Sequence, residues 1–178
     1  MDEEKLIVRA ARESDIDAVT AIYDAIHDAE ESGGATIGWV RGVYPTRATA
    51  EAALAAGDLF VMEADGLVVA AARINQDQVP EYADAQWQYD ATPNEVMVLH
   101  TLVVDPACGG RGIGRSFVAF YEDYAREQGC RYLRMDTNER NARARALYAK
   151  LGYAEPDIVP CVFNGIEGVQ LVCLEKAL

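Results

Sequence analysis

Positive charge is scarce in this sequence. Its 178 residues include 16 lysines and arginines against 29 aspartates and glutamates, which gives a formal net charge of −13 at pH 7. A protein that binds nucleic acid broadly needs a basic surface for the phosphate backbone, and anionic lipid selects for basic residues in the same way. We therefore expect neither nucleic acid nor a membrane as a partner. The acidic balance suits a cationic small substrate, although plain solubility is the simpler explanation.

Long apolar runs, paired cysteines and zinc-like histidine spacing are also missing. No segment reaches the roughly 18 uncharged apolar residues of a membrane span, and the first residues show no basic stretch leading into an apolar one, as an export signal would. The four cysteines form no Cys-x-x-Cys pair, and no histidine lies at finger-like spacing from them. These absences predict a cytoplasmic protein with reduced thiols and no bound metal.

What the sequence does contain is the pattern of a globular domain. We expect residues 1–178 to form a single domain, because chains of this length usually do and no repeat or linker interrupts this one. Apolar periodicity and turn residues predict the order β-α-α-β-β-β-α-β-α-β, in which an antiparallel meander leads into one β-α-β crossover. The predicted fold is α/β, with a mixed, mainly antiparallel central sheet and flanking helices. The expected strands are 6–8, 59–63, 67–74, 96–104, 131–137 and 169–175, and the expected helices are 14–31, 47–56, 113–128 and 141–151.

Local signals mark several of the connections. Ser14 and Thr46 are candidate caps for the first two helices. Asp65-Gly66 lies between two apolar runs and favours a tight hairpin, because both residues tolerate a positive φ. The stretch from Asn75 to Asn94 is polar and aromatic and contains two prolines. We expect it to be a long excursion outside the core, of the kind that often serves function in a compact domain.

A glycine-rich loop follows the long apolar strand. Glycines at positions 109, 110, 112 and 114 leave backbone N–H groups uncovered just before a helix N-terminus, which adds partial positive charge. This arrangement predicts a pyrophosphate site, to which Arg111 and Arg115 add full charges. It is not a P-loop, because the chain has no Gly-Lys pair, and it fails the dinucleotide fingerprint, whose third glycine would fall at Arg115 or Phe117. A purely structural turn is the alternative interpretation.

Two motifs together resemble the GNAT superfamily of N-acyltransferases. Val103-Val104-Asp105-Pro106, followed by residues 109–114, is similar to that superfamily's acyl-CoA loop. Residues 141–153 begin with Asn141, contain Leu147-Tyr148 and end in Gly-Tyr, which is similar to its second signature. Both motifs stand in the family's order, and the element order extends the resemblance over nearly the whole chain. One departure is Gly109, where the family usually has Gln or Arg.

The resemblance implies a GNAT-like fold and an N-acetyltransferase that uses acetyl-CoA. The acetyl group would pass by direct attack to a primary amine of a small molecule, and no metal requirement is visible. A homodimer is an expectation by resemblance, since family members often dimerise through their C-terminal strands. The residues that the resemblance and the loop chemistry place against acetyl-CoA are Leu102, Val103, Val104, Gly109, Gly110, Arg111, Gly112, Ile113, Gly114, Arg115, Asn141 and Tyr148.

Direct transfer needs an oxyanion donor, an acid for the departing thiolate and a base for the amine. Strand N–H groups near Leu102–Val104 suit the oxyanion. Tyr148 matches the family's general acid, although its apolar helix face also fits a core residue. His100 is the first candidate for the base, and it stands two residues from Leu102, so the two side chains should share one face of the strand. Glu95, or a chain of waters with no dedicated base, is the alternative.

The acceptor site is expected in the segment between the first two helices. The candidates there, Glu31, Trp39, Arg41 and Tyr44, combine charges with aromatic surface, which suits a small amine or an amino-acid-like molecule; a packed connector is the alternative. Other functions stay open as well. They are a non-catalytic CoA-binding or sensing module, acetylation of a peptide or protein amine and, less favoured because the third glycine is missing, a nucleotide-dependent oxidoreductase.

Overall fold

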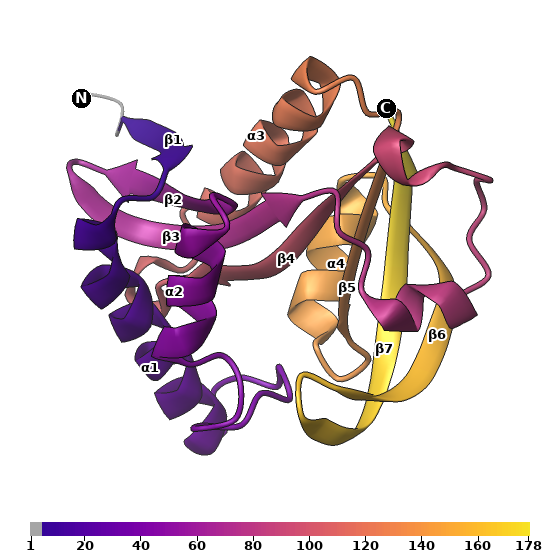
Figure 1. Ribbon diagram of the computed structural model, residues 1–178. Helices are drawn as coiled ribbons and strands as arrows, with labels where there is room; N and C mark the ends of the chain where they lie inside the picture. Colours follow the sequence, from indigo (N-terminus) through magenta and orange to yellow (C-terminus); the bar gives the residue numbers. More distant parts are fainter. Residues whose placement is uncertain (1–4) are drawn as a thin grey trace.

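One seven-stranded sheet with helices on both faces makes up the computed structural model, which describes residues 5–178 (Figure 1). The strand order is β1-β2-β3-β4-β5-β7-β6, and every neighbouring pair is antiparallel except β4 and β5. The predicted mixed, mainly antiparallel sheet is therefore confirmed. The strands are β1 (Leu6–Ala10), β2 (Leu59–Ala64), β3 (Leu67–Asn75), β4 (Val96–Val104), β5 (Tyr132–Asn138), β6 (Ala154–Phe163) and β7 (Ile166–Ala177), and the helices are α1 (Ile16–Glu31), α2 (Arg47–Ala55), α3 (Ile113–Glu127) and α4 (Ala142–Lys150).

Strand β6 is not among the strands predicted from the sequence. The strand pairs with β7 through a hairpin whose turn residues, Asn164 and Gly165, have φ values of 50° and 78°. Positive φ at both positions is typical of a type I′ turn, for which Asn-Gly is the preferred pair. The signal was thus present in the sequence. The other predicted hairpin, at Asp65-Gly66, is confirmed, with φ values of 51° and 82°.

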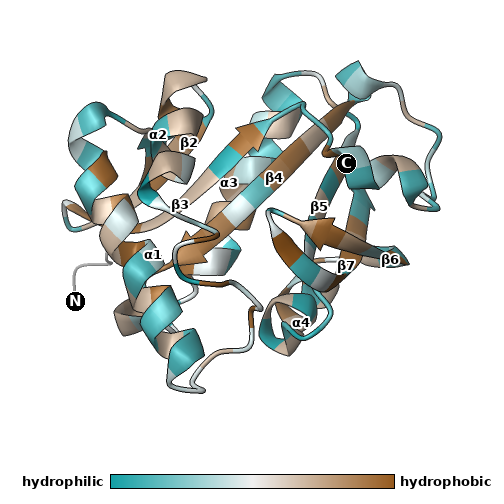
Figure 2. Ribbon diagram, turned by 60° about the horizontal axis from the view of Figure 1, so that its bottom comes forward, coloured by the Kyte–Doolittle hydropathy of each residue, from teal (hydrophilic) through white to brown (hydrophobic). Residues whose placement is uncertain are grey.

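Helices pack against the sheet on both sides because each has one apolar stripe. On one face, α3 and α4 cover a core that includes Phe117 and Leu133. On the other face, α1 and α2 cover a second core that includes Val19 and Val61. Figure 2 shows this patterning as brown strands in the interior and helices that alternate between teal and brown. No helix within residues 5–178 combines the length and apolar character that crossing a membrane requires.

The helix starts differ in how they are capped. Thr46 is the N-cap residue of α2, the position predicted for it, and the side-chain hydrogen bond there comes from Thr49, whose Oγ1 accepts the Thr46 backbone N–H at 2.9 Å. Ser14 does not cap α1, because it lies inside a short 3₁₀ turn at Glu13–Asp15. Asp15 is the residue just before α1, and its carboxylate accepts the backbone N–H of Arg12 at 2.7 Å, which closes the 3₁₀ turn without capping α1.

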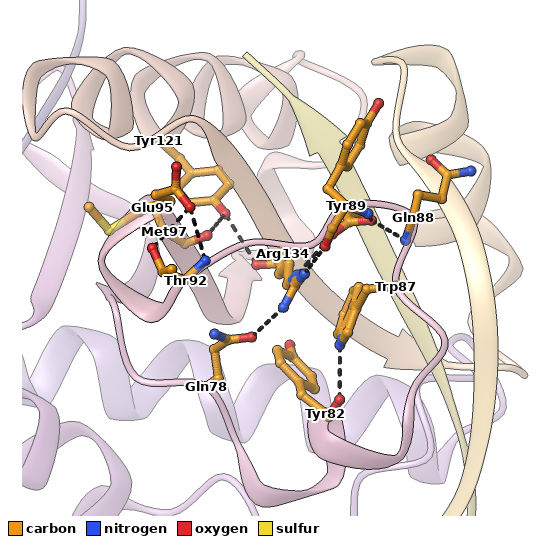
Figure 3. A network of polar contacts seen from close by, with 11 residues as sticks. Gln78, Tyr82, Trp87, Gln88, Tyr89, Thr92, Glu95, Met97, Tyr121 and Arg134 are labelled. Atoms are coloured by element: carbon orange, nitrogen blue, oxygen red, sulfur yellow. Dashed lines mark hydrogen bonds and ion pairs between the residues drawn. The ribbon is translucent and has the colours of Figure 1, made fainter.

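The segment between β3 and β4 is anchored in the core, which corrects the expected excursion outside it. Tyr82, in the 3₁₀ helix η2 (Pro80–Asp84), is 2% exposed. Arg134 of β5 makes three contacts with this segment (Figure 3). Its guanidinium donates hydrogen bonds to Gln78 Oε1 at 2.7 Å and to the Tyr89 carbonyl at 3.0 Å. It also stacks on the Trp87 ring, 4.2 Å from the ring centroid. The segment is therefore a fixed wall.

Candidate active site

The two parallel strands separate partway along their length. β4 and β5 pair only from Val96 to Leu99, and beyond that point β5 pairs with β7 alone (Figure 1). A bulge causes the divergence: Thr101 has a φ of 52°, and the register between β4 and β3 shifts by one residue there. The edge of Thr101–Val104 that faces β5 thus has no strand partner, and its backbone groups are free for a ligand.

A cavity of about 1290 Å³ occupies this opening and reaches both faces of the sheet. One part, the donor half, is lined by the glycine loop, the start of α3 and α4. The other part, the acceptor half, is lined by residues 34–39 and 44, by 73 and 77–80, by 136–138 of β5, and by 163, 164, 166, 169 and 171. Single-ligand pockets rarely exceed about 1,000 Å³. The volume therefore suits two substrates that meet in the middle.

The donor half offers backbone N–H groups to an anion. Gly110 and Gly112 have φ values of 82° and 75°, and no atom lies within 4 Å of a Cβ added to either. Gly112 is the N-cap of α3, whose first N–H groups have no partner within the helix. Arg115, Arg143 and Lys150 also line this half, and the last two were not predicted. These groups fit the pyrophosphate of CoA, because uncovered N–H groups, a helix N-terminus and cationic side chains all favour a bound anion.

The predicted donor residues gather in this half with one exception. All of them line the cavity apart from Arg111, which lies on the exposed surface of the loop. Asn141 caps α4, and its Oδ1 accepts the backbone N–H of Ala144 at 3.2 Å. Gly114 lies where its added Cβ would be 3.5 Å from Leu147, so α3 begins close beside α4.

Tyr148 is a buried phenol in the wall of the cavity. It is 7% exposed and lines the cavity from α4. Burial raises the pKa of its phenol, and the nearby Asp136 carboxylate raises it further. Among residues 5–178, no group hydrogen-bonds the phenol hydroxyl. The residue is thus a neutral hydroxyl, with a proton to donate and no protein acceptor for it.

The two candidate bases from the sequence, His100 and Glu95, differ in their place relative to the cavity. His100 lines the cavity, but its Nε2 donates to Asn75 Oδ1 at 2.8 Å, and burial beside Arg73 lowers its pKa to about 4. The expected shared face with Leu102 is wrong, because the bulge at Thr101 reverses the alternation: Leu102 packs into the core under α3 and α4, whereas His100 pairs opposite Arg73 on the other face.

Glu95 lies outside the cavity. Its carboxylate closes a capping box, accepting the backbone N–H and the hydroxyl of Thr92, both at 2.9 Å. The hydrogen bonds from Thr92 lower its pKa. The geometry therefore gives Glu95 a structural role at the start of β4.

The four predicted acceptor residues divide into two pairs. Trp39 and Tyr44 line the cavity and pack edge to face, with ring centroids 5.9 Å apart. The Tyr44 hydroxyl hydrogen-bonds the hydroxyl of Thr101 at the bulge, and burial raises its pKa to about 12. Glu31 and Arg41 lie outside the cavity lining, where they form an exposed ion pair at 2.9 Å. The structure brings the aromatic pair to the site and leaves the charged pair on the surface.

Asp136 is the residue that the sequence analysis did not assign to the site. It stands in β5 just beyond the last pair with β4, and it lines the cavity. Its Oδ2 accepts the Tyr82 hydroxyl at 2.6 Å, and burial raises its pKa to about 6. The available signal was an acidic residue near the end of the strand that follows the crossover. Among the described residues, no cluster of three or more His, Cys, Asp or Glu is arranged to hold a metal.

Gly38 fixes the loop between α1 and α2 against the end of β5. Its φ is 85°, and an added Cβ would lie 2.5 Å from Asn138 Nδ2. We expect Gly38→Ala to lower the free energy of unfolding by about 2–4 kcal/mol, from left-handed strain of about 1–2 kcal/mol and a further overpacking cost. Gly42→Ala is the matched control, because Gly42 has a φ of 76° but nothing within 4 Å of its Cβ. Urea unfolding measures the free energy of unfolding of both variants. An equal loss of stability in the two would show that the contact with Asn138 adds no overpacking cost.

Comparisons with known proteins agree with this geometry. A family model described as "Acetyltransferase (GNAT) family" matches residues 19–153. An uncharacterized N-acetyltransferase of Methanocaldococcus jannaschii is 32% identical over 76 residues, which are 43% of this chain and 34% of that protein. The match thus spans about a third of that curated relative.

Two solved structures share the fold. A GNAT-family acetyltransferase from Streptococcus agalactiae superposes with a TM-score of 0.79 at 21% identity, covering 97% of this chain and 95% of that one. YncA from Salmonella typhimurium, a candidate acetyltransferase solved with its cofactor acetyl-CoA, gives a TM-score of 0.69 at 21% identity, with 98% and 94% covered. At these identities the likeness concerns the fold alone.

Proposed function

The chain belongs to the acetyltransferase (GNAT) family, and from that premise we propose that it transfers the acetyl group of acetyl-CoA to a primary amine of a small molecule. The observation that carries the proposal is the single cavity through the split between β4 and β5. One end has the features of an anion site, and the other end is apolar and aromatic. Tyr148 lines the same cavity from α4, and its phenol interacts electrostatically with Asp136.

The donor half supports acetyl-CoA as the donor. The N–H groups around Gly110 and Gly112 and the start of α3 would bind the pyrophosphate, with Arg115 and Arg143 adding charge. The unpaired edge of Thr101–Val104 would hydrogen-bond the amides of the pantetheine arm and stabilise the oxyanion that forms on the thioester carbonyl. Gly109 removes a family side chain from this loop but leaves the backbone N–H groups in place.

Direct transfer needs few groups from the protein. The amine nitrogen attacks the thioester carbon, a tetrahedral oxyanion forms, and the C–S bond breaks. Tyr148 gives its phenolic proton to the departing sulfur and regains one from the nitrogen as the amide forms. Its raised pKa keeps it protonated until thiolate appears, which suits an acid better than a base.

The shape of the acceptor half favours a small acceptor over a protein. The loop between α1 and α2 meets the β6–β7 turn there, since a Cβ on Gly165 would lie 3.3 Å from Val43 Cγ1. Thr36 Oγ1 also donates to the Arg140 carbonyl at 3.1 Å, which ties the same loop to the end of β5. These contacts bridge the opening, so an extended peptide would have to displace them. A CoA-sensing module, the other alternative, gives no reason for an unpartnered Tyr148 hydroxyl in the cavity.

Acetyl-CoA binding is the first test of this proposal. A ligand at 100 times its dissociation constant adds about 2.7 kcal/mol of stability, which for a chain of this size raises Tm by roughly 5–10 °C. We expect that rise with acetyl-CoA and with CoA, and none with NAD, which serves as the control ligand. Release of free thiol in the presence of primary amines then separates an enzyme from a sensing module. Stabilisation by NAD alone would contradict the proposal.

A further inference from the structure

Asp136 places a carboxylate in the cavity, close enough to Tyr148 for the two groups to interact electrostatically. Asp136 lines the cavity from the part of β5 that has left β4. Its Oδ2 is held by the Tyr82 hydroxyl at 2.6 Å. Within residues 5–178, no donor is recorded for Oδ1. One oxygen therefore fixes the carboxylate, and the other is free to accept a hydrogen bond from a ligand.

The charge of Asp136 is not neutralised by a cation. Its environment raises rather than lowers its pKa, because burial outweighs the hydrogen bond from Tyr82. The titratable groups that face it from the elements around it are Glu81 and Tyr82 of η2, Tyr148 of α4, Tyr44 of the α1–α2 loop, Cys161 of β6 and Cys173 of β7. All of these are acids or neutral hydroxyls and thiols, so an incoming ammonium would be the first positive charge beside this carboxylate.

The rest of the acceptor half is apolar or already paired. Of its described residues, Arg73, Asp77 and Asp136 are the charged ones. Arg73 donates twice to Asp58, at 2.9 and 3.1 Å, and the Asp77 side chain is 81% exposed. An acceptor with a second charge would thus find no free partner inside. The apolar walls come from Trp39, Tyr44, Phe163, Ile166, Val169 and Leu171.

We propose that Asp136 binds the ammonium group of the acceptor and takes its proton, and that the acceptor is a primary amine with an apolar body. The inference rests on the proposed acetyl transfer. An alkylammonium carries no lone pair and must lose a proton before it can attack. Asp136 lines the cavity with an acceptor oxygen that no protein donor holds, whereas Glu95 lies outside the cavity. His100 also lines it, but burial beside Arg73 lowers its pKa and makes it the weaker base.

The proton balance is complete with groups that the site contains. The ammonium gives one proton to Asp136, and the neutral amine attacks the thioester carbon. As the C–S bond breaks, sulfur takes the Tyr148 proton, and the phenol recovers the second proton that the nitrogen loses. The products are the amide and CoA thiol, and Asp136 passes its proton to solvent. One H⁺ is released in each turnover that starts from an ammonium.

Kinetics with simple amines test the proposal. The probes are n-butylamine, benzylamine and 2-phenylethylamine at saturating acetyl-CoA, with phenylalanine as the acceptor that adds a carboxylate. We expect the three amines to be acetylated more efficiently than phenylalanine. The wild-type kcat/KM should fall below pH 6, because Asp136 must be ionised to accept a proton and its pKa is about 6. Asp136→Asn should lower kcat/KM by about 100-fold or more. It should also abolish the fall of kcat/KM at low pH, the acidic limb of the pH profile.

Two neighbours shift the limb in opposite directions. Tyr82→Phe removes the hydrogen bond that lowers the pKa of Asp136, so the limb should move to higher pH. Glu81→Gln removes a negative charge that raises the pKa, so the limb should move to lower pH. Asp84→Asn changes an exposed carboxylate on the same short helix and should leave the profile unchanged. A purely structural role for Asp136 would not produce opposite shifts.

The outcomes separate this inference from the proposed function. If acetyl-CoA fails to stabilise the wild type, the proposed function itself fails. If acetyl-CoA stabilises both the wild type and Asp136→Asn, and the variant keeps its activity and its acidic limb, only the role of Asp136 is overturned. If the protein binds acetyl-CoA but acetylates none of the three amines, or prefers phenylalanine, the proposed acceptor class is overturned.

Discussion

Replacing Tyr148 with phenylalanine is expected to lower kcat by about 100- to 10,000-fold, the usual contribution of a positioned general acid. The phenol lines the cavity without a protein partner, and its raised pKa keeps its proton available for the departing thiolate. Phenylalanine retains the ring and its packing, so acetyl-CoA should still raise Tm as it does for the wild type. Steady-state thiol release and a thermal-shift titration measure the two quantities.

Tyr153→Phe is the matched control for this substitution. The two rings pack edge to face at 5.9 Å, but the Tyr153 hydroxyl donates to Glu122 at 3.0 Å, away from the cavity lining. Its loss should cost about 1 kcal/mol of stability, as for an ordinary hydrogen bond, and little activity. Equal kcat values for the wild type and Tyr148→Phe would contradict the assignment of Tyr148 as the acid.

Replacing Arg134 with methionine is expected to lower the free energy of unfolding by about 3–5 kcal/mol, because it leaves a buried carboxylate without its cation. Arg134 Nε donates to Glu175 Oε2 at 2.9 Å, and the side chains are 6% and 0% exposed. The same guanidinium holds Gln78 and the Tyr89 carbonyl (Figure 3). Urea unfolding measures the loss, and the midpoint should fall while the slope stays constant.

A double variant separates charge burial from the other contacts. Glu175 Oε1 accepts the backbone N–H of Gln88 at 2.8 Å, and a glutamine at this position retains an acceptor oxygen. Arg134→Met combined with Glu175→Gln should therefore be more stable than Arg134→Met alone, because no uncompensated charge stays buried. If the double variant is the less stable of the two, the lost contacts to the segment between β3 and β4 dominate. That segment supplies part of the acceptor half, so either variant also tests how firmly this wall is held.

Several features of the molecule followed from local sequence. The long strand at 96–104 was predicted with its observed bounds, because an apolar run ends at Asp105-Pro106 and proline cannot continue a strand. The glycine loop and the helix that starts at Asn141 were predicted from short-range rules on glycine spacing and apolar periodicity. Such signals lie within a few residues of the turn or helix end that they specify. They can therefore be recognised in a single sequence without knowledge of the tertiary contacts.

The acceptor half could not be predicted in the same way. Glu31 and Arg41 looked like binding residues, but they pair with each other on the surface of α1 and its loop. Asp136 and Tyr82 are 54 positions apart and meet only because β5 and the segment after β3 pack together. The bulge at Thr101 turned His100 away from Leu102, and no strong bulge signal marks a threonine in advance.

The sequence by itself determined the family, the order of most elements and the donor half, because glycine spacing and helix starts encode the anion site locally. Only the tertiary structure decided which groups face the acceptor. The gap between β4 and β5, the wall held by Arg134 and the unneutralised carboxylate of Asp136 all depend on contacts between distant segments. Side-chain burial and the pairing of charges are properties of that packing, and they set which residues stay free to react.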